Sequence, residues 1–429
     1  MILRVGQIRI NTKNLIYFVL ILTLVMGTLT DDFGIPGVIR YMNDVIVIIL
    51  FLLLLKRKDF LNKISFFGMN TIFIAMILFS VVNIITIVIN FVPLNLVLWA
   101  VRNTYRFFVF FWACVLFLDK DDLDKIFEIF YWLQWINFLL VLYQFFGLGL
   151  KQDSLGGIFG HGGNAGLLVY SVILLAYAIS KFISKEYSMF RMVFVLVSTS
   201  FISVLAEIRV FFVMALIIII VNLFLNRNIM RKTMIMFGLV VLFFLAIDIY
   251  KELFPYVTLS IEALLEEGNS TGGGYNISRL NAFSDIKRIF FKDDLICNLL
   301  GYGFGNCEYS TIPIFCSEFY REYGSFNYRW FTNQWIFLET GYAGIITYLM
   351  ILCTSFVYSF KCYGKVHKEK KSLIVICIIM CIVCIISVFY NSLLKADYGY
   401  IAFFAIAIAG IVFKGERKDV EGVYKESNL

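Results

Sequence analysis

Arginines in or beside long apolar stretches are the residues of this sequence that most plainly could do chemistry. Arg102 and Arg106 lie four positions apart, so their side chains share one face of a predicted helix. Two cations on one face need anions close by. The sequence leaves two explanations open, a bound phosphate group or a carboxylate on a neighbouring helix.

A third arginine, Arg209, interrupts an apolar stretch that runs from Met192 to Leu225. Two membrane-spanning helices fit into this stretch only if the chain reverses near residues 206–209. A charged side chain at the bilayer centre costs at least about 2.5–3.5 kcal/mol, so an arginine in or at the membrane favours a functional role. The alternative is an interfacial arginine that pairs with Glu207.

A glycine-rich stretch, GGIFGHGGNAG at 156–166, holds His161 and Asn164. Glycines let the backbone approach a ligand closely. We therefore expect these two polar side chains to belong to a binding site.

The longest polar segment, residues 251–331, lies between two apolar halves and carries Arg279 and Arg288 among many aromatic residues. Disordered segments are poor in aromatic residues, so we expect this one to fold. Arginine suits bidentate recognition of phosphate, and aromatic faces suit sugar rings. A lipid-linked sugar pyrophosphate is a ligand that fits both.

Within this segment the patterns predict three features. An amphipathic helix is expected at 256–267 and a glycine-rich hinge at 268–276. A second helix should begin at Ser278, which suits an N-cap, with an apolar stripe that includes Leu280, Phe283 and Ile289. The run GYGFG that follows suits a sharp turn or a close backbone approach.

The composition gives the class of protein. Of the 429 residues, 61% are hydrophobic and 18% aromatic, whereas roughly half of a soluble domain is apolar. This is the composition of a polytopic membrane protein. The net charge of +7 does not indicate nucleic-acid binding, because the basic residues gather between apolar stretches, where they mark topology.

The predicted fold is an all-α polytopic membrane protein with about twelve transmembrane helices, since a bilayer core requires roughly 20 apolar residues per span. The spans are 14–30, 43–55, 65–91, 97–118, 126–147, 164–180, 191–206, 209–225, 233–250, 333–360, 372–390 and 398–413. Lys and Arg gather in every second loop, which places both termini in the cytoplasm and residues 251–331 outside. The chain then divides into nine helices in 1–250, a large, partly helical outer loop in 251–331, and three helices with a cytoplasmic tail in 332–429.

Neither a metal nor another cofactor is indicated. The nine cysteines follow no metal-site spacing, and no acidic cluster stands out. Cys297, Cys307 and Cys316 share the large loop and could form one disulfide if that loop faces an oxidising compartment.

Five motifs together resemble the O-antigen polymerase and O-antigen ligase superfamily, bacterial membrane enzymes that act on glycans linked to undecaprenyl pyrophosphate. The motifs are GIFGHGGNAG before a helix, AEIRVFF at the predicted hairpin, SRLNAF at the start of a loop helix, LLGYGFGN and TNQWIFLETGYAGIITY. They cover roughly residues 150–360. Their order, together with twelve helices and a large outer loop between the ninth and tenth, makes the resemblance more specific than any one motif.

The resemblance implies roles for particular residues. Arg209 and Arg279 correspond to phosphate-binding arginines, and we expect His161 to act with them in catalysis. The remaining residues are expected to bind substrate: Arg102, Arg106, Arg288, Asn164, Asn333 and Glu339.

Ligases of the superfamily place a histidine just before the tenth helix, where this chain has Thr332 and Asn333. We therefore expect a polymerase of O-antigen, capsule or exopolysaccharide repeats in the cytoplasmic membrane of a bacterium. Its partners would be an undecaprenyl-pyrophosphate-linked oligosaccharide, the lipid bilayer and a chain-length regulator. The alternatives are an O-antigen ligase and a flippase for lipid-linked oligosaccharides, although no repeat relates the two halves as is typical of transporters.

Reporter fusions test the predicted topology. Fusions at Lys120, Lys232 and Lys368 should report the cytoplasm, because basic residues gather around them, and fusions at Asp153 and Ser270 should report the outside. An outside signal at Lys368 would contradict this topology.

Overall fold

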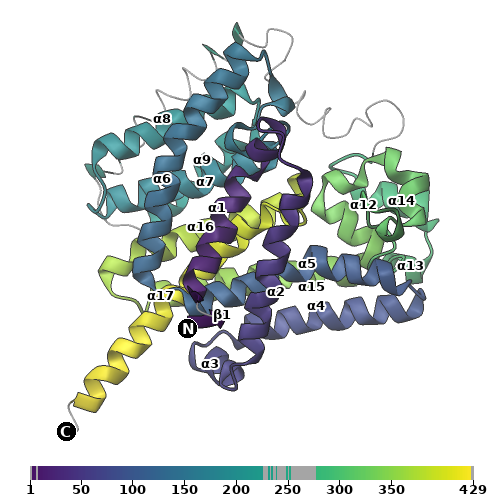
Figure 1. The fold of residues 1–429 in the computed structure, drawn as a ribbon, viewed down its shortest axis with the longest axis horizontal. Helices are drawn as coiled ribbons and strands as arrows, with labels where there is room; N and C mark the ends of the chain where they lie inside the picture. The colour runs from purple at the N-terminus through teal and green to yellow at the C-terminus, as the bar shows by residue number, and fades with distance from the viewer. Residues whose placement is uncertain are drawn as a thin grey trace.

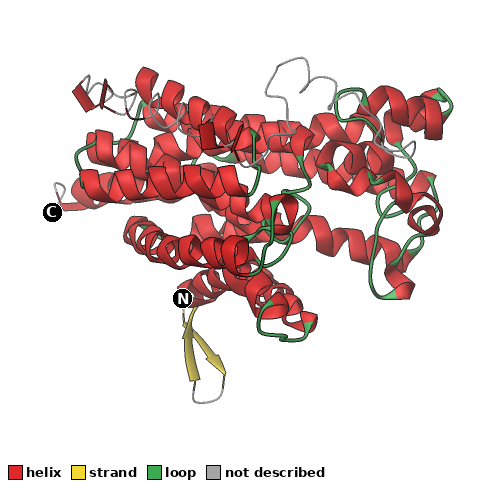
Figure 2. Ribbon diagram, turned by 90° about the horizontal axis from the view of Figure 1, so that it is seen from above, coloured by secondary structure: helices red, strands yellow, loops and turns green. Residues whose placement is uncertain are grey.

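The computed structural model describes residues 2–5 and 8–225, scattered positions between 230 and 252, and residues 277–426. Most of the described chain is helical (Figures 1 and 2). The predicted span at 233–250 lies mostly outside the described residues, and the predicted amphipathic helix at 256–267 and hinge at 268–276 lie wholly outside them.

The elements have the following bounds. The longer helices are α1 (Thr12–Asp31), α2 (Tyr41–Leu55), α4 (Asn70–Ile89), α5 (Leu94–Phe117), α6 (Lys120–Leu142), α7 (Asn164–Ile183), α8 (Met189–Leu205), α9 (Val210–Leu225), α15 (Thr332–Tyr363), α16 (Lys371–Tyr390) and α17 (Gly399–Glu426). The short helices are α3 (Phe60–Phe66), α12 (Ala282–Ile286), α13 (Leu295–Leu300) and α14 (Glu318–Tyr323). Strands β1 (Ile2–Val5) and β2 (Ile8–Asn11) form an antiparallel hairpin that projects beside α1 (Figure 2).

Eight helical segments of the described chain are long and apolar enough to cross a membrane. They are α1, α2 with the 3-10 turn before it, α4, α6 with the π turn after it, α7, α15, α16 and α17. Helices α8 and α9 are apolar but have only 17 and 16 residues. The prediction of a helical membrane protein is confirmed, whereas the count of twelve spans is not.

Two kinds of helix support this membrane assignment. Helix α7 and the Gly399–Glu416 part of α17 are almost wholly buried within the protein, so they form its centre. In contrast, α4 turns apolar side chains outward, among them Ile77, Ile84 and Val88. An outward apolar face of this length suits lipid, and the helix satisfies its own backbone hydrogen bonds there.

Helix boundaries follow local sequence signals. Asp119 and Asp122 form a capping box at the start of α6, where the Asp119 amide donates to Asp122 Oδ2 at 2.8 Å. The predicted span at 65–91 begins late, at Asn70, because Gly68 adopts a positive φ of 71° and ends α3. The predicted reversal at 206–209 is confirmed, since α8 ends at Leu205, Glu207 takes a φ of 54° and α9 begins at Val210.

Helix α15 is broken at Gly341, and the glycine run of the large loop fits into the break. Gly341 has φ 58° and ψ −157°, which is not helical. The amides of Tyr302 and Gly303 donate to the carbonyls of Leu338 and Glu339 at 2.8 and 2.9 Å, so the loop binds carbonyl groups just before the break. The GYGFG run therefore makes the close backbone approach that its glycines predict.

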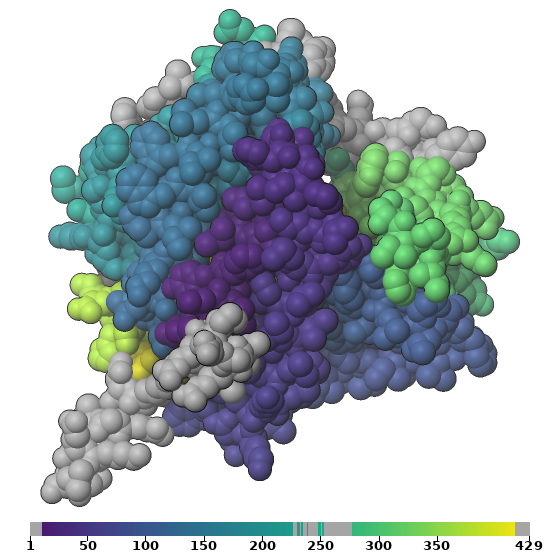
Figure 3. Space-filling model, viewed as in Figure 1, coloured from purple at the N-terminus to yellow at the C-terminus, as the bar shows by residue number. Residues whose placement is uncertain are grey.

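The rest of the large loop from residue 277 onward is compact. Helices α12, α13 and α14 gather beside the ends of α4, α5 and α15, and in space-filling view this part lies against the segment near residue 100 (Figures 1 and 3). The predicted loop helix is present but begins at Ala282 rather than Ser278. Ser278 instead donates to Asp285 Oδ2 at 2.8 Å, and Leu280 and Ile289 are exposed rather than part of a buried stripe.

Replacing Gly341 with alanine tests the role of the break. A β-carbon there would collide with the backbone of Leu299, and the φ and ψ values lie in a region open mainly to glycine. We expect destabilisation of about 2–6 kcal/mol, as the sum of about 1–3 for backbone strain and about 1–3 for overpacking. The unfolding midpoint of the detergent-solubilised protein measures this.

Gly37→Ala is the matched control, since no atom lies close to the position that a β-carbon would take there and its φ is not positive. Its midpoint should equal that of the wild type. Equal midpoints for Gly341→Ala and Gly37→Ala would show that the break does not depend on glycine.

Candidate functional site

Segments that the sequence places on the outer face contact one another in the structure. Hydrogen bonds join Asn90 to Gly301, Trp99 to Tyr309, Asn164 to Ala206 and Thr332 to Asn391. Segments placed on the opposite face do the same, as in the ion pairs of Lys13 with Asp119 and of Lys181 with Asp124. Contacts between loops therefore follow the two groups that the basic residues predict.

Arg279 differs from the other predicted site arginines in its surroundings. Its guanidinium lies over the rings of Phe331 and Tyr390, 5.2 and 5.5 Å from their centroids, and its side chain is exposed. Within the described ranges no carboxylate pairs with it. Aromatic faces hold a guanidinium in place without neutralising it, so Arg279 retains its charge for a ligand.

The start of α15 lies next to Arg279. Gln334 Nε2 donates to the carbonyl of Ser278 at 3.4 Å, which ties the segment before Arg279 to the first turn of this helix. No side chain caps the helix start. The Thr332 amide donates to the carbonyl of Asn391 at 3.0 Å, so the helix dipole, rather than a full set of free amides, makes this end favourable for a negative charge.

Asn333, a predicted substrate-binding residue, lies in this first turn. Its side chain and that of Gln334 are buried, and neither Asn333 Oδ1 nor Gln334 Oε1 accepts a hydrogen bond from the described part of the chain. A buried carbonyl oxygen without a donor is uncommon in proteins. Both oxygens would accept a hydrogen bond from a hydroxyl group that reached them.

Arg329 belongs to the same region, although the sequence analysis did not single it out. Its guanidinium lies over Tyr309, Tyr320 and Trp335, at 4.6, 5.4 and 4.5 Å from their centroids. Its buried Nε has no hydrogen-bond partner among the described residues. In the sequence, its position directly before Trp330 and close to the motif TNQWIFLETGYAGIITY, in a loop rich in aromatic residues, could have indicated a binding role.

Glu339, the other predicted substrate-binding residue of α15, lies inside the protein in a buried ion cluster. The Lys395 ammonium is 3.3 Å from Glu308 Oε1 and 3.5 Å from Glu339 Oε2, and all three side chains are at most 1% exposed. Asn103 Nδ2 donates to Glu308 Oε2 at 2.7 Å, and the Gly305 amide donates to Glu339 Oε1 at 3.2 Å. Glu339 therefore has protein partners rather than an open position for substrate.

Arg102 and Arg106 have carboxylate partners, which is the second of the two explanations that the sequence left open. Arg102 Nη2 lies 2.5 Å from Asp44 Oδ2. Arg106 Nη1 lies 3.2 Å from Asp44 Oδ1 and 2.8 Å from Asp397 Oδ1. These ion pairs join α5 to α2 and to the turn before α17, so their evident role is to hold helices together.

Arg209 and Asn164 lie at the α8–α9 reversal, and His161 lies in the loop just before α7. Arg209 Nη2 lies 2.5 Å from Glu207 Oε1, the pairing that the sequence offered as an alternative. Asn164 Nδ2 is 3.5 Å from the carbonyl of Ala206. Helix α9, which begins after Arg209, packs against α16, whose last residue contacts Arg279.

Two aspartates contact His161, one through its backbone amide and the other through its imidazole ring. Its amide donates to Asp31 Oδ2 at 2.7 Å, and its Nε2 lies 3.1 Å from Asp32 Oδ1. A carboxylate that orients an imidazole is typical of histidines that act as general bases. The side chain is 41% exposed, so a substrate hydroxyl can reach it.

The remaining predictions concern Arg288 and the loop cysteines. Arg288 pairs with Asp285 at 3.2 Å, and its side chain is 75% exposed. Cys297, Cys307 and Cys316 are all free thiols, so the disulfide considered from the sequence is absent. In the described ranges no group of three His, Cys, Asp or Glu side chains could hold a metal ion.

Comparisons with known proteins give no family assignment. The sequence matches none of the protein-family models scanned, and a search of curated proteins finds no match. The functional argument therefore rests on the residues of this chain and on the motif resemblance.

Replacing Lys395 with methionine tests the ion cluster. The change leaves Glu308 and Glu339 buried without their cation, and such a loss costs about 3–5 kcal/mol. We expect a large fall in the unfolding midpoint. Lys151→Met, at an exposed position in another loop, is the matched control and should leave the midpoint unchanged; equal midpoints for both variants would refute a structural role for the cluster.

Proposed function

We propose that this protein is a glycan polymerase of the cytoplasmic membrane that uses repeat units linked to undecaprenyl pyrophosphate. The observation that carries the proposal is the environment of Arg279, an exposed guanidinium held on two aromatic rings beside the start of α15. A pyrophosphate would meet a planar cation and a positive helix end in one place. The motif resemblance assigns the same arginine to phosphate binding.

The reaction is a transfer of the growing glycan to an acceptor repeat unit. The bond between the anomeric carbon and the pyrophosphate oxygen breaks, and a bond from that carbon to an acceptor hydroxyl oxygen forms. The pyrophosphate leaves with the electron pair of the broken bond, and Arg279 stabilises its developing charge. The hydroxyl proton passes to a base, for which His161 with its Asp32 neighbour is our candidate.

Arg209 and Arg329 complete the proposed donor site. Arg209 lies at the reversal before α9, and α9 packs on α16, which ends beside Arg279. Arg329 contributes a second guanidinium near the start of α15, among aromatic rings that suit sugar faces. In this proposal the large loop and the starts of α7, α9 and α15 face away from the cytoplasm.

A transporter of lipid-linked oligosaccharides is a second candidate, favoured by the break of α15 at Gly341. Broken helices form the substrate sites of many transporters. The break in this protein is occupied by the backbone of the GYGFG run, however, whose amides bind the carbonyls just before it. We therefore rank this function second and use the cellular phenotype to separate the two.

Substitution of Arg279 tests the proposed function. In membranes supplied with purified lipid-linked repeat units, Arg279→Ala and Arg209→Ala should each lower the polymerisation rate about ten- to a hundredfold, the value of one charge-assisted hydrogen bond at the transition state. Arg279→Lys should recover little, because an ammonium lacks the planar fork. Arg40→Ala, at another exposed arginine of the same face, is the matched control.

The phenotype of cells distinguishes the two candidate functions. A polymerase that loses Arg279 leaves single repeat units displayed at the surface, because their assembly and flipping do not need this protein. A transporter that loses it strands the units on the cytoplasmic side. Chains of wild-type length from both Arg279→Ala and Arg209→Ala cells would contradict the proposed site.

A further inference from the structure

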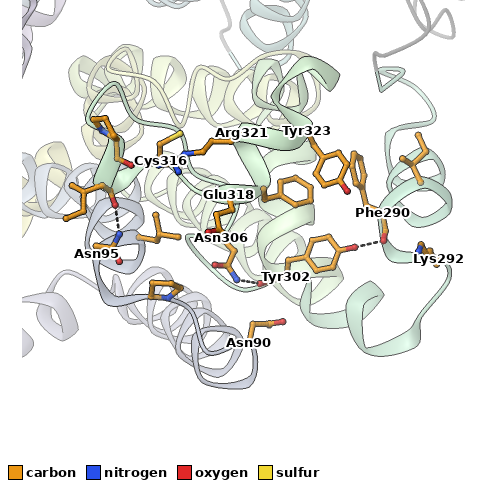
Figure 4. Close-up of a pocket in the computed structure, with 16 residues that line it drawn as sticks. Asn90, Asn95, Phe290, Lys292, Tyr302, Asn306, Cys316, Glu318, Arg321 and Tyr323 are labelled. Carbon is orange, nitrogen blue, oxygen red and sulfur yellow. Dashed lines mark hydrogen bonds between the residues drawn. The ribbon is translucent and has the colours of Figure 1, made fainter.

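A second site lies apart from Arg279, where the turn between α4 and α5 meets the large loop. A pocket of about 810 Å³ opens there (Figure 4). One wall comes from residues 90–96 and the other from residues 289–323. Small-molecule sites commonly have volumes of about 300–1,000 Å³, so the pocket is large enough for several sugar units or a comparable ligand.

Contacts across the pocket floor hold its two walls together. Asn90 Nδ2 donates to the carbonyl of Gly301 at 3.5 Å, and Trp99 Nε1 donates to the carbonyl of Tyr309 at 2.8 Å. The ring of Trp99 stacks on Phe315, with centroids 5.1 Å apart and planes 6° from parallel. The pocket is therefore formed in the protein as it stands and needs no closure of the loop.

Three asparagines give the pocket its polar character. Each side-chain amide donates through Nδ2 to a backbone carbonyl, which fixes its orientation: Asn90 to Thr86 at 2.9 Å, Asn306 to Tyr302 at 2.7 Å, and Asn95 to Ile314. Asn90 also donates to the carbonyl of Gly301, so both of its N–H groups are in use, whereas Asn95 and Asn306 each use one. Each Oδ1 is left as an acceptor, and an acceptor selects ligands that carry O–H or N–H groups.

An aromatic wall lines another side of the pocket. Phe290, Phe319 and Tyr323 contact one another, with ring centroids 5.0–5.4 Å apart. The Tyr302 hydroxyl donates to the carbonyl of Phe290 (Figure 4), and burial raises the pKa of Tyr302 to about 12, so this phenol stays neutral. Such a wall packs against the C–H faces of sugar rings.

The pocket rim carries two cations and one anion. Lys292 and Arg321 are cations, and Glu318 is an anion. Arg321 is already partly engaged, because its Nη2 donates to the carbonyl of Pro313 at 2.8 Å. The Glu318 carboxylate in this rim repels a polyanion such as pyrophosphate, whereas no carboxylate of the described residues pairs with Arg279, and this distinguishes the pocket from the Arg279 site.

Apolar side chains beside the pocket place it at the lipid surface. Phe91 and Leu94 flank the lining residues of one wall and are 90% and 72% exposed, and Ile314 of the other wall is 64% exposed. Exposed apolar residues at a helix end of a membrane protein favour contact with acyl chains. A ligand in the pocket can therefore remain attached to a lipid.

We propose that this pocket binds a neutral, hydroxyl-rich glycan, through the three asparagine oxygens and the aromatic wall. The assignment of this glycan as a segment of the polymer or acceptor rests on the proposed function. The class of ligand, a neutral hydroxyl-rich glycan, does not rest on the proposed function, because a glycolipid headgroup of the bilayer offers the same hydroxyl groups. The experiment below therefore has one arm for each source.

The test is direct binding to purified full-length protein in nanodiscs. In the first arm, the probe is the oligosaccharide released by mild acid from the lipid-linked repeat units, and the nanodiscs contain only phospholipid. In the second arm, a diglycosyl diacylglycerol is added to the nanodiscs. Calorimetry or thermophoresis gives Kd in the first arm, and lipid co-purification gives occupancy in the second.

Asn95→Leu and Asn306→Leu remove the acceptors while keeping side-chain size. One hydrogen bond between neutral groups is worth about two- to twelvefold in affinity, so each variant should raise Kd by that factor and the double variant by about fivefold or more. Asn70→Leu, an exposed asparagine distant from the pocket in the sequence and outside its lining, is the matched control. Unfolding midpoints equal to that of the wild type establish that the variants fold.

The outcomes separate this proposal from the proposed function. Weaker binding by the double variant in either arm supports the pocket, and the arm in which it occurs identifies the source of the glycan. Binding equal to that of the wild type, or no binding in either arm, overturns it. Arg279→Ala should bind the released oligosaccharide as the wild type does; if that variant also polymerised normally, the proposed function would fail while the pocket would stand.

Discussion

A single buried ammonium, that of Lys395, connects four parts of the protein. It lies between Glu308 of the large loop and Glu339 of α15, and it contacts Thr104 of α5 at 3.2 Å. Lys395 itself belongs to the turn between α16 and α17. Removing charges from water is expensive, so the cluster is stable only because hydrogen bonds from Asn103 and Gly305 satisfy both carboxylates. The position of the large loop on the helices depends on this arrangement.

The arginines of this face divide into two groups by their neighbours. Arg102, Arg106 and Arg209 have carboxylate partners within 3.2 Å, and Arg102 and Arg106 lie over aromatic rings as well. Arg279 and Arg329 lie over aromatic rings and pair with no carboxylate of the described residues. An ion pair neutralises a guanidinium, while a ring face orients it and leaves most of its charge available. Two arginines of the proposed donor site, Arg279 and Arg329, come from the second group, whereas the third, Arg209, is paired with Glu207.

Local patterns of the sequence predict much of the fold, and long-range pairing explains the rest. The reversal at 206–209 and the close approach of GYGFG follow from neighbouring residues, and both predictions are confirmed. The partners of Arg106 are Asp44 and Asp397, which are too distant in sequence to be recognised as neighbours. Lys395 lies in a loop of the predicted outer face, where few basic residues are expected. Its ion pairs with the buried carboxylates of Glu308 and Glu339 explain this exception. Arg329 becomes a candidate for substrate binding only in the folded protein, where aromatic rings from three separate segments lie against its guanidinium.

The most direct test of the central claim is a cryo-EM structure of the protein with a lipid-linked repeat unit bound. The proposed function predicts pyrophosphate density within about 3 Å of the Arg279 guanidinium, at the start of α15. The sugar chain should then extend towards the aromatic side chains of the large loop. Pyrophosphate density elsewhere, with Arg279 still lying over Phe331 and Tyr390 and in contact with no ligand, would contradict the claim.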